Sequence, residues 1–304
     1  MIKIRVVQTS PVTWSRMRTL LAVADAGGVR AAAQALHVSE PAVSSAVAQV
    51  ERRLGADLFH KSGRGIALTE AGRVYADYCR TILGLVEEAA AAVHRAGVGS
   101  LRLGAVGTAS EYVVPRLLAR FTRLHPDVRL TLTVLPRDEL FSSLTHHELD
   151  LVFAGRPPRG SGLVSRATRE NSLVVVGAPV LQGDPLTSPW LLRGPGSGTR
   201  ETTLSLLAQL EAAPPTLTLG TLGAVVAAAR EGLGLTLVHA DAVADDLEAG
   251  RLVAVPLART PMKRPWHLVT GPSPTAAALL FVATCTDADD LGPAAFHLRN
   301  RPRG

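Results

Sequence analysis

Residues 30–72 read RAAAQALHVSEPAVSSAVAQVERRLGADLFHKSGRGIALTEAG, and this stretch decides the fold of the N-terminal part of the chain. It predicts a helix, a tight turn, a second helix with a polar face and then a basic hairpin. That order is typical of a winged helix-turn-helix that binds DNA. Ser39 is placed to cap the second helix, and Pro41 falls in its first turn, where a missing N–H costs nothing. The alternative is a structural helical hairpin with a solvated loop, which the combination of cap, turn and basic hairpin disfavours.

The second helix divides into an apolar stripe and polar faces. The spacing of Val43, Val47, Val50 and Leu54 by four, three and four residues predicts one buried stripe. The remaining faces and the glycine-rich hairpin turn, which suits phosphate contact, carry the candidate DNA-binding residues. These are Arg30, Ser39, Glu40, Pro41, Ser44, Ser45, Gln49, Arg52, Arg53, Lys61 and Arg64. We expect Arg64→Ala to weaken binding to every DNA sequence and to lower the salt slope of binding by roughly one.

Composition is compatible with a DNA-binding protein of two or more domains. The chain has 304 residues and a formal net charge of +6, and residues 1–97 carry 12 basic and 8 acidic side chains, a net of +4. It is 47% hydrophobic but only 4% aromatic, so Ala, Val and Leu must supply most of the core. No apolar run approaches the ~20 residues of a membrane span, and no secretory signal is evident. We therefore expect a cytoplasmic protein with no membrane partner.

The chain divides into a leader (1–13), the winged helix-turn-helix (14–69), a long linker helix (70–97), an α/β domain (98–290) and a tail (291–304). In the long helix, apolar residues alternate steps of four and three over three heptads, which predicts a seam that pairs with another helix. The seam runs through Ala71, Tyr75, Tyr78, Ile82, Leu85, Ala89 and Ala92, of which Tyr75, Tyr78, Ile82, Leu85 and Ala89 are the candidate dimerisation residues. Packing of this helix on its own domain is the alternative.

Strands and helices alternate beyond residue 100, which predicts a parallel-leaning α/β sheet covered by helices and divided into two lobes by a cleft. The expected strands span residues 101–106, 129–134, 150–153, 172–176, 216–219, 235–238 and 266–269. The expected helices span residues 111–124, 138–147, 199–210, 222–230 and 275–284.

These residues carry a resemblance to the LysR-type transcriptional regulators. The phrases AAAQALHVSEPAVSSAVAQVERRLGADLF and GRGIALTEAG are similar to the DNA-binding signature of that family. The phrases LRLGAVGTASEYVVPRLLARFTRLHPDVRLTL, HHELDLVFAG, WLLRGPGSGTRETT and LGTLGAVVAAAREGLGLTLV resemble landmarks of its effector-binding domain. The resemblance runs from about Met17 to Gly271. It implies a multidomain α+β and α/β protein, with a bilobed effector domain like that of periplasmic binding proteins and assembly as a homodimer or a dimer of dimers.

Four residues differ from the pattern that is usual in the family. Gly28 stands where Ser is usual, which removes a side-chain cap, and Glu40 stands where Gln is usual. Ser45 stands near a position where Arg is usual, and because serine is short and uncharged, less backbone affinity is expected from the second helix. Lys61 stands where Arg is usual and would have to supply part of that affinity. Glu40 is favourable at a helix N-terminus and could accept a hydrogen bond from a cytosine N4 amine. These departures predict an operator preference that is the chain's own.

The candidate effector-binding residues open predicted helices, where free backbone N–H groups and hydroxyls converge on an anion. They are Thr108, Ser110, Ser197, Thr199, Arg200 and Thr221, each of which also has a plain interpretation as a cap or turn residue. A small anionic effector such as a carboxylate or phosphate metabolite is expected. Arg137 is interpreted as a solvated surface residue rather than a cleft residue.

Enzymatic and metal-binding alternatives lack their motifs. The chain contains neither G-x-x-x-x-G-K-[ST] nor G-x-S-x-G, so no catalytic residue is proposed. The consecutive His146, His147 and Glu148 diverge around a helix, and two cysteines, Cys79 and Cys285, predict neither a metal site nor a disulfide framework. We expect a DNA-binding transcriptional regulator without a cofactor, modulated by a small-molecule effector, with double-stranded DNA, a second copy and RNA polymerase as candidate partners. The alternative is an architectural or constitutive regulator whose α/β domain serves only oligomerisation.

Overall fold

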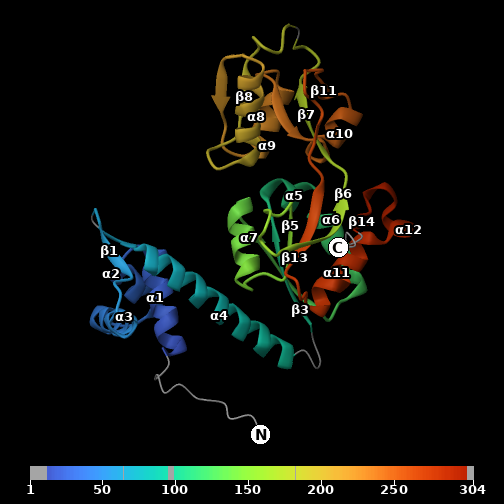
Figure 1. The fold of residues 1–304 in the computed structure, drawn as a ribbon. Helices are drawn as coiled ribbons and strands as arrows, with labels where there is room; N and C mark the ends of the chain where they lie inside the picture. The colour runs from blue at the N-terminus through green and yellow to red at the C-terminus, as the bar shows by residue number, and fades with distance from the viewer. Residues whose placement is uncertain (1–11, 64, 95–98, 182, 300–304) are drawn as a thin grey trace. The chain divides into compact units, whose positions relative to one another are not determined.

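The computed structural model describes residues 12–63, 65–94, 99–181 and 183–299. The chain forms two compact units, residues 1–93 and 94–304, which are described separately (Figure 1). The expected leader falls almost wholly on residues 1–11, which lie outside the described part, as does Arg64.

The first unit is a three-helix module followed by a hairpin and a long helix. Its elements are α1 (Trp14–Ala26), α2 (Val29–Leu36), α3 (Glu40–Leu54), β1 (Phe59–Ser62), β2 (Gly65–Leu68) and α4 (Glu70–His94). The Ser39 hydroxyl caps α3 by accepting from the Ala42 N–H, and Pro41 lies in the first turn. Gly55 ends α3 in the left-handed conformation (φ 66°), which glycine adopts without strain. The local sequence signals therefore set both ends of α3.

Two apolar clusters hold this unit together. Leu20, Val50, Leu58 and Ala76 form one, and Val23, Ala32, Ala33 and Val43 form the other, all at most 3% exposed. Truncating such a buried leucine to alanine costs about 2–5 kcal/mol. The Glu51 carboxylate accepts from the Leu58 N–H at 2.8 Å and so fixes the loop that leads into the hairpin.

The long helix packs closely on the hairpin at Gly72. A Cβ there would lie 2.0 Å from the Leu58 carbonyl oxygen, so only glycine allows this approach. The stripe expected on α3 is only partly buried, because Leu54 is 43% exposed at the last turn, where the helix extends beyond the core. The linker helix expected over residues 70–97 is described from Glu70 to His94, and residues 95–97 lie outside the described part.

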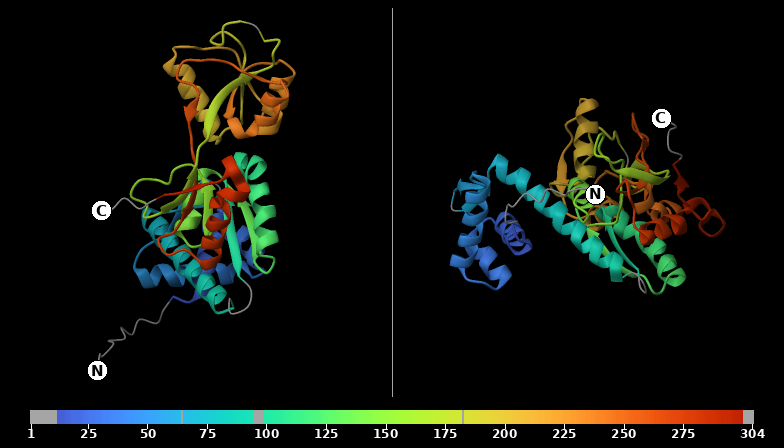
Figure 2. Two further views of the ribbon diagram at one scale, coloured as in Figure 1. Left: turned by 90° about the vertical axis from the view of Figure 1, so that its right-hand side faces the viewer. Right: turned by 60° about the horizontal axis from the view of Figure 1, so that its bottom comes forward.

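The second unit has two lobes (Figure 2). Lobe I contains a six-stranded sheet of order β14-β6-β13-β5-β3-β4. Its elements are β3 (Ser100–Ala105), α5 (Gly107–Tyr112), α6 (Val114–Leu124), β4 (Arg129–Val134), α7 (Arg137–Thr145), β5 (Leu151–Ala154), β6 (Val164–Arg169), β13 (Trp266–Thr270), α11 (Ala276–Thr286), α12 (Ala288–Leu291), η2 (Gly292–Ala294) and β14 (His297–Leu298). Side chains of β5 alternate between the two faces. Phe153 packs with the cluster of α6 and α11, whereas Val152 packs with α7.

Lobe II is built on β7, which pairs with β10, β11 and β12, all antiparallel. Its elements are β7 (Ser172–Gly177), β8 (Trp190–Leu192), α8 (Gly198–Gln209), β9 (Thr216–Thr218), α9 (Leu222–Arg230), β10 (Thr236–His239), η1 (Ala240–Ala242), α10 (Ala244–Glu248), β11 (Val253–Ala254) and β12 (Met262–Lys263). Val176 packs with α9 and Val175 packs with α8, so helices cover both faces of β7.

The six-stranded sheet of lobe I is mixed and the β7 sheet of lobe II is antiparallel, which corrects the expectation of parallel-leaning sheets. Strands β3, β4 and β5 are parallel, but β13 runs antiparallel to both of its neighbours. The reason is the chain's path, because β6 leads out of lobe I toward β7 and β13 returns from lobe II. The single helix expected over residues 111–124 is two helices, α5 and α6. Pro115 follows the break, since proline cannot continue the hydrogen-bond ladder of a helix.

The C-terminal segment packs on lobe I instead of forming a separate tail. Phe296 is 1% exposed, and β14 pairs with β6 through His297 and Leu298. Among the described residues, no helix is long and apolar enough to cross a membrane.

Candidate nucleic-acid interface and inter-lobe cleft

One polar face of α3 is open to solvent. Ser39, Glu40 and Pro41 are exposed at its start, and Ser44 and Ser45 are exposed one turn later. Gln49 is half-buried and donates to the Ser45 hydroxyl at 3.0 Å, which orients its amide. The cap at Ser39 and the buried Val43 and Val50 on the opposite side fix the helix, so its polar face is presented as a rigid surface.

Exposed cations lie on α2, on α3 itself and on β1. Arg30, Arg52, Arg53 and Lys61 are exposed, and within the described part of the chain none of them has an acidic partner. Lys61 stands on β1, opposite Ile66 of β2 in the hairpin. Unpaired exposed cations of this kind are what phosphate contacts require.

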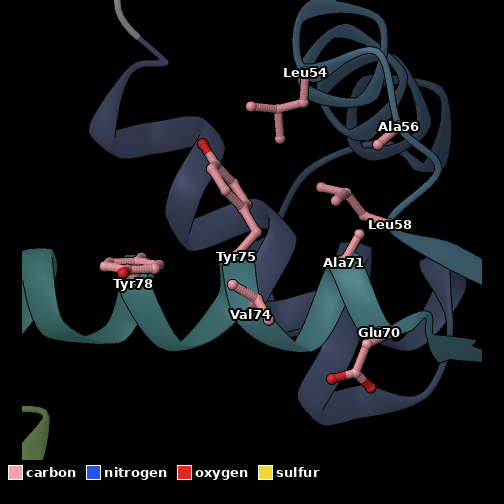
Figure 3. A pocket seen from close by; sticks show the side chains of 8 residues that line it. All are labelled: Leu54, Ala56, Leu58, Glu70, Ala71, Val74, Tyr75 and Tyr78. Atoms are coloured by element: carbon pink, nitrogen blue, oxygen red, sulfur yellow. The ribbon is translucent and has the colours of Figure 1, made fainter.

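The α4 seam borders an apolar groove of about 320 Å³ (Figure 3). The groove is lined by Leu54, Ala56, Leu58, Glu70, Ala71, Val74, Tyr75 and Tyr78. Tyr75 is half-buried against the module's own core, whereas Tyr78 is 66%, Ile82 39% and Leu85 44% exposed. The Ala89 side chain lies outside the described residues. An exposed run of large apolar side chains on one helix marks an interaction surface.

A cleft of about 770 Å³ lies between lobes I and II. Three expected effector residues line it, since Thr108 follows β3 and Ser197 and Thr199 open α8. Ser197 caps α8 by accepting from the Arg200 N–H at 3.4 Å. The first turn of α8 therefore faces the cleft with backbone N–H groups that have no partner within the helix.

The other three expected residues do not line the cleft. Ser110 donates to the Gly107 carbonyl at 2.8 Å, and Thr221 caps α9 at the Ala224 N–H. The Arg200 guanidinium donates to the Arg193 carbonyl at 2.9 Å and to Thr218 at 3.0 Å. The plain cap and turn interpretation therefore describes Ser110 and Thr221. Arg200 holds the end of β8, and through it the backbone of a cleft residue.

The cleft is strongly basic. Its lining includes Arg137, Arg156, Arg193, Lys263 and Arg264, and no aspartate or glutamate. The interpretation of Arg137 as a surface residue is wrong, since it lines the cleft and donates to the Arg156 carbonyl at 2.7 Å. Apart from Arg137, which pairs with the exposed Asp138, these cations have no ion-pair partner among the described residues. The other four were not identified from the sequence.

Two histidines of the cleft are neutral near pH 7. The pKa of His239 is lowered to about 4, chiefly by burial, which outweighs the opposing effect of the nearby Asp241 carboxylate. The pKa of His267 is also lowered to about 4, by burial first and then by nearby arginines. His267 is 2% exposed, and its Nδ1 lies 2.8 Å from the Ser165 hydroxyl. Its Nε2 is buried without a hydrogen-bond partner in the described structure, an arrangement that costs free energy unless a ligand or water satisfies it.

A polar network joins the two strands that cross between the lobes. The Asp241 carboxylate of lobe II accepts from Arg169 at the end of β6, at 2.5 Å, and from Trp266 Nε1 at the start of β13, at 2.6 Å. The His239 ring stacks on Trp266 with centroids 4.5 Å apart. Asn171 donates to the Arg264 carbonyl at 3.2 Å. The crossovers are thus tied to lobe II beside the cleft.

The two cysteines have no exposed thiol. Both are buried, and burial raises the pKa of Cys79 to about 11 and raises that of Cys285 further. Thiols with raised pKa values are poor nucleophiles at neutral pH. Among the described residues, no group of three or more His, Cys, Asp or Glu side chains could hold a metal ion.

Comparison with known protein families matches both units. Residues 14–73 match the family described as "Bacterial regulatory helix-turn-helix protein, lysR family", and residues 94–290 match the "LysR substrate binding domain". A curated relative from Allochromatium vinosum, named "RuBisCO operon transcriptional regulator", is 34% identical over 85% of this chain and 89% of its own. The relative from Escherichia coli K12 named "Uncharacterized HTH-type transcriptional regulator YeiE" is 31% identical over 84% of this chain and 91% of its own.

Solved structures share the fold. The crystal structure of CbnR, "a LysR family transcriptional regulator", has a TM-score of 0.62 at 22% identity and covers 90% of this chain and 97% of its own. ArgP from Mycobacterium tuberculosis has a TM-score of 0.64 at 18% identity over 88% of this chain and 94% of its own.

Proposed function

The chain belongs to the LysR family of transcriptional regulators, and we propose that it binds double-stranded DNA through α3 and the β1–β2 hairpin under the control of a small anion in the inter-lobe cleft. It is a regulator with an effector-binding domain and not an enzyme. The observation that carries the effector proposal is the cleft itself, which has five cationic side chains and no carboxylate in its lining. The names of the relatives leave the controlled operon open, since they range from a RuBisCO operon regulator to an uncharacterised one.

The DNA interface combines base reading with phosphate contact. Ser44 and Ser45 face outward from α3, where either hydroxyl can reach a base edge, and Glu40 can accept from a cytosine amine. Arg30, Arg52, Arg53, Lys61 and Arg64 supply the contacts to phosphate. Each such contact releases about one counterion, so removing one cation lowers the salt slope by about one unit.

The phosphate contact is tested by salt titration. We expect Lys61→Ala to lower affinity for every DNA fragment and to reduce the slope of log affinity against log salt by about one. Arg259→Ala, which removes one positive charge from the surface of lobe II, serves as the control and leaves the slope unchanged. An unchanged slope for Lys61→Ala with an altered base preference would assign the residue to sequence reading instead.

The effector site is tested with inorganic phosphate as the probe. We expect phosphate to raise the thermal midpoint of the second unit, because a ligand that binds only the folded state stabilises it by mass action. Arg193→Gln should weaken that stabilisation. Arg259→Gln removes a cation from the surface of lobe II, where it bonds Gln209, and should preserve it. Loss of the phosphate effect in both variants, or in neither, would contradict the assignment.

The effect on transcription requires coupling between cleft and DNA. A ligand shifts the balance of two arrangements only by its differential affinity for them, which for allosteric regulators is about 1–3 kcal/mol. If the DNA footprint stays identical when ligand saturates the cleft, the ligand does not control DNA binding. The alternative role, in which the α/β domain serves only assembly, would then be supported.

Dimerisation is proposed through the exposed seam of α4. Tyr78, Ile82 and Leu85 continue the apolar groove along the helix, and Tyr75 joins the seam to the core of the first unit. Ala89 extends the same heptad pattern. We expect Ile82→Glu to shift the chain toward monomer in sedimentation, while Arg73→Ala on another face of α4 leaves the assembly intact. A dimer unchanged by Ile82→Glu would remove the seam from the interface.

A further inference from the structure

The cations of the cleft fall into two groups carried by different lobes. Arg137 opens α7 and Arg156 follows β5, both in lobe I, and the bond from Arg137 to the Arg156 carbonyl holds the two together. Arg193 follows β8 in lobe II, and Lys263 and Arg264 stand where the chain leaves lobe II. Arg264 donates to the Thr202 hydroxyl of α8 at 3.3 Å, which brings its guanidinium to the helix that opens on the cleft.

Each group is placed to hold an anion. On the lobe II side, Arg193 and Arg264 line the cleft together with Ser197 and Thr199. Ser197 and Thr199 stand at the start of α8, a twelve-residue helix. The Nε of Arg193 is buried without a partner in the described structure. On the lobe I side, Arg156 lies close enough to His267 to lower its pKa, and the buried Nε2 of His267 also lacks a partner. Arg193 Nε is a donor, and His267 Nε2 is a donor in the tautomer whose Nδ1 accepts from Ser165. Unsatisfied buried nitrogens on both sides point to a ligand that reaches both.

Charge balance separates a ligand with one anionic group from a ligand with two. Among the described residues, Arg137 is paired with Asp138 and the other four cations of the cleft have no ion-pair partner, so a single negative charge would leave most of them uncompensated. Planar guanidinium groups bind carboxylate and phosphate oxygens in forked pairs, so two arginines in each group suit one anionic group each. A cleft of about 770 Å³ has room for a molecule that spans both.

We infer that the cleft takes a small molecule with two anionic groups, carboxylate or phosphate, one held by Arg137 and Arg156 of lobe I and the other by Arg193 and Arg264 at the start of α8. This inference rests on the proposed function, since it specifies the anion that the regulator binds. A ligand held in this way joins the two lobes directly. Its binding energy therefore favours one relative position of the lobes over others, which is what an effector requires.

The test compares matched pairs of probes by calorimetry on the full chain at constant ionic strength. Succinate is compared with succinamate, in which an amide replaces one carboxylate, and 1,3-propanediyl bisphosphate is compared with propyl phosphate. The two pairs distinguish carboxylate from phosphate as the preferred group. We expect the doubly anionic member of at least one pair to bind about tenfold more tightly or better, which corresponds to about 1.4 kcal/mol.

Variants on each side locate the two contacts. Arg156→Gln and Arg264→Gln each replace an exposed side chain, so folding is preserved, and each should abolish most of the preference for the doubly anionic probe. Arg259→Gln on the surface of lobe II is the control and should keep it.

Equal binding within both pairs would overturn the inference while leaving the proposed function in place, as would a preference that survives both variants. Absence of binding by all four probes and by inorganic phosphate would also remove the anionic effector from the proposed function, while DNA binding would be judged separately by the salt titration.

Discussion

Asp241→Asn tests whether the network at the lobe crossovers stabilises the second unit. Asp241 accepts from the Arg169 guanidinium at 2.5 Å and from Trp266 Nε1 at 2.6 Å. Asparagine keeps the size and one acceptor oxygen but removes the charge. The substitution therefore isolates the electrostatic part of the network and leaves packing nearly unchanged.

The magnitude follows from burial. The Arg169 side chain is 12% and that of Asp241 26% exposed, so the pair is largely withdrawn from water. Removing one partner of a buried pair costs about 3–5 kcal/mol, because the other charge stays buried and uncompensated. The Arg169 Nε has no hydrogen-bond partner in the described structure, so the guanidinium depends on Asp241 for its compensating charge. Arg169 and Trp266 both donate to Asp241 Oδ2, and an asparagine oxygen in that place can still accept from them. Since these bonds can persist and Asp241 is one quarter exposed, we expect a loss of about 2–3 kcal/mol, below the full cost of an uncompensated buried charge.

Urea unfolding followed by tryptophan fluorescence measures this loss. The signal comes from the second unit when Trp14 of the first unit is replaced by phenylalanine in every variant, because Trp190 and Trp266 are both buried in the second unit. Asp245→Asn is the matched control at an exposed position near Asp241. We expect the unfolding midpoint to fall for Asp241→Asn with an unchanged slope, as for a pure loss of stability. A change of less than about 0.5 kcal/mol, typical of a surface substitution, would refute the reasoning.

Three further predictions concern stability. Because the pKa values of His239 and His267 are lowered to about 4 in the folded protein, the unfolded chain binds more protons between pH 6.5 and 4, and thermal midpoints should fall as pH falls through that range. Replacing both histidines by glutamine should flatten this dependence, and a midpoint constant from pH 7 to pH 5 in the parent chain would contradict it. The Asp246 carboxylate is 2% exposed and accepts from Arg230 at 2.6 Å, so Asp246→Asn should destabilise the second unit by about 3 kcal/mol in the same urea assay. A loss no larger than that of Asp245→Asn would argue against this prediction. Ser39→Ala should cost the first unit about 1 kcal/mol through loss of the α3 cap, measured by its thermal midpoint, whereas Ser44→Ala on the exposed face should cost less.

The helix-turn-helix could be predicted because its signals are local. A serine cap, a proline in the first turn and a glycine after the last turn bound α3 within the sequence itself, and the structure places all three there. Leu54 is the exception, since the spacing pattern shows which face a residue shares but not how far the core extends beneath it. The break between α5 and α6 also has a local cause in the sequence, because Pro115 falls in the first turn of α6.

The C-terminal segment could not be placed from sequence because its partners are distant along the chain. The Phe296 N–H donates to the Cys285 carbonyl at 2.8 Å, and the short strand β14 pairs with Ala167 and Thr168 of β6. A strand of two residues gives no periodicity, and only the tertiary structure brings it to the edge of the sheet. The antiparallel return of β13 has the same origin, since it depends on which lobe the chain leaves.

The basic cleft could be predicted from the sequence only in part. Arg137, Arg156 and Arg193 each follow a strand by one to three residues, and those strands are β4, β5 and β8. In open α/β sheets, ligands bind outside the carboxyl ends of parallel strands, and β4 and β5 both run parallel to β3. A basic residue just beyond a strand end is therefore a stronger signal for an anion site than a hydroxyl at a helix start. The criterion applies to Arg137 and Arg156, which follow strands expected from the sequence, but not to Arg193, because β8 is not among those strands. Lys263 and Arg264 lie in and directly after β12, a two-residue strand that gives no periodicity in the sequence, and they line the cleft where the chain crosses between the lobes.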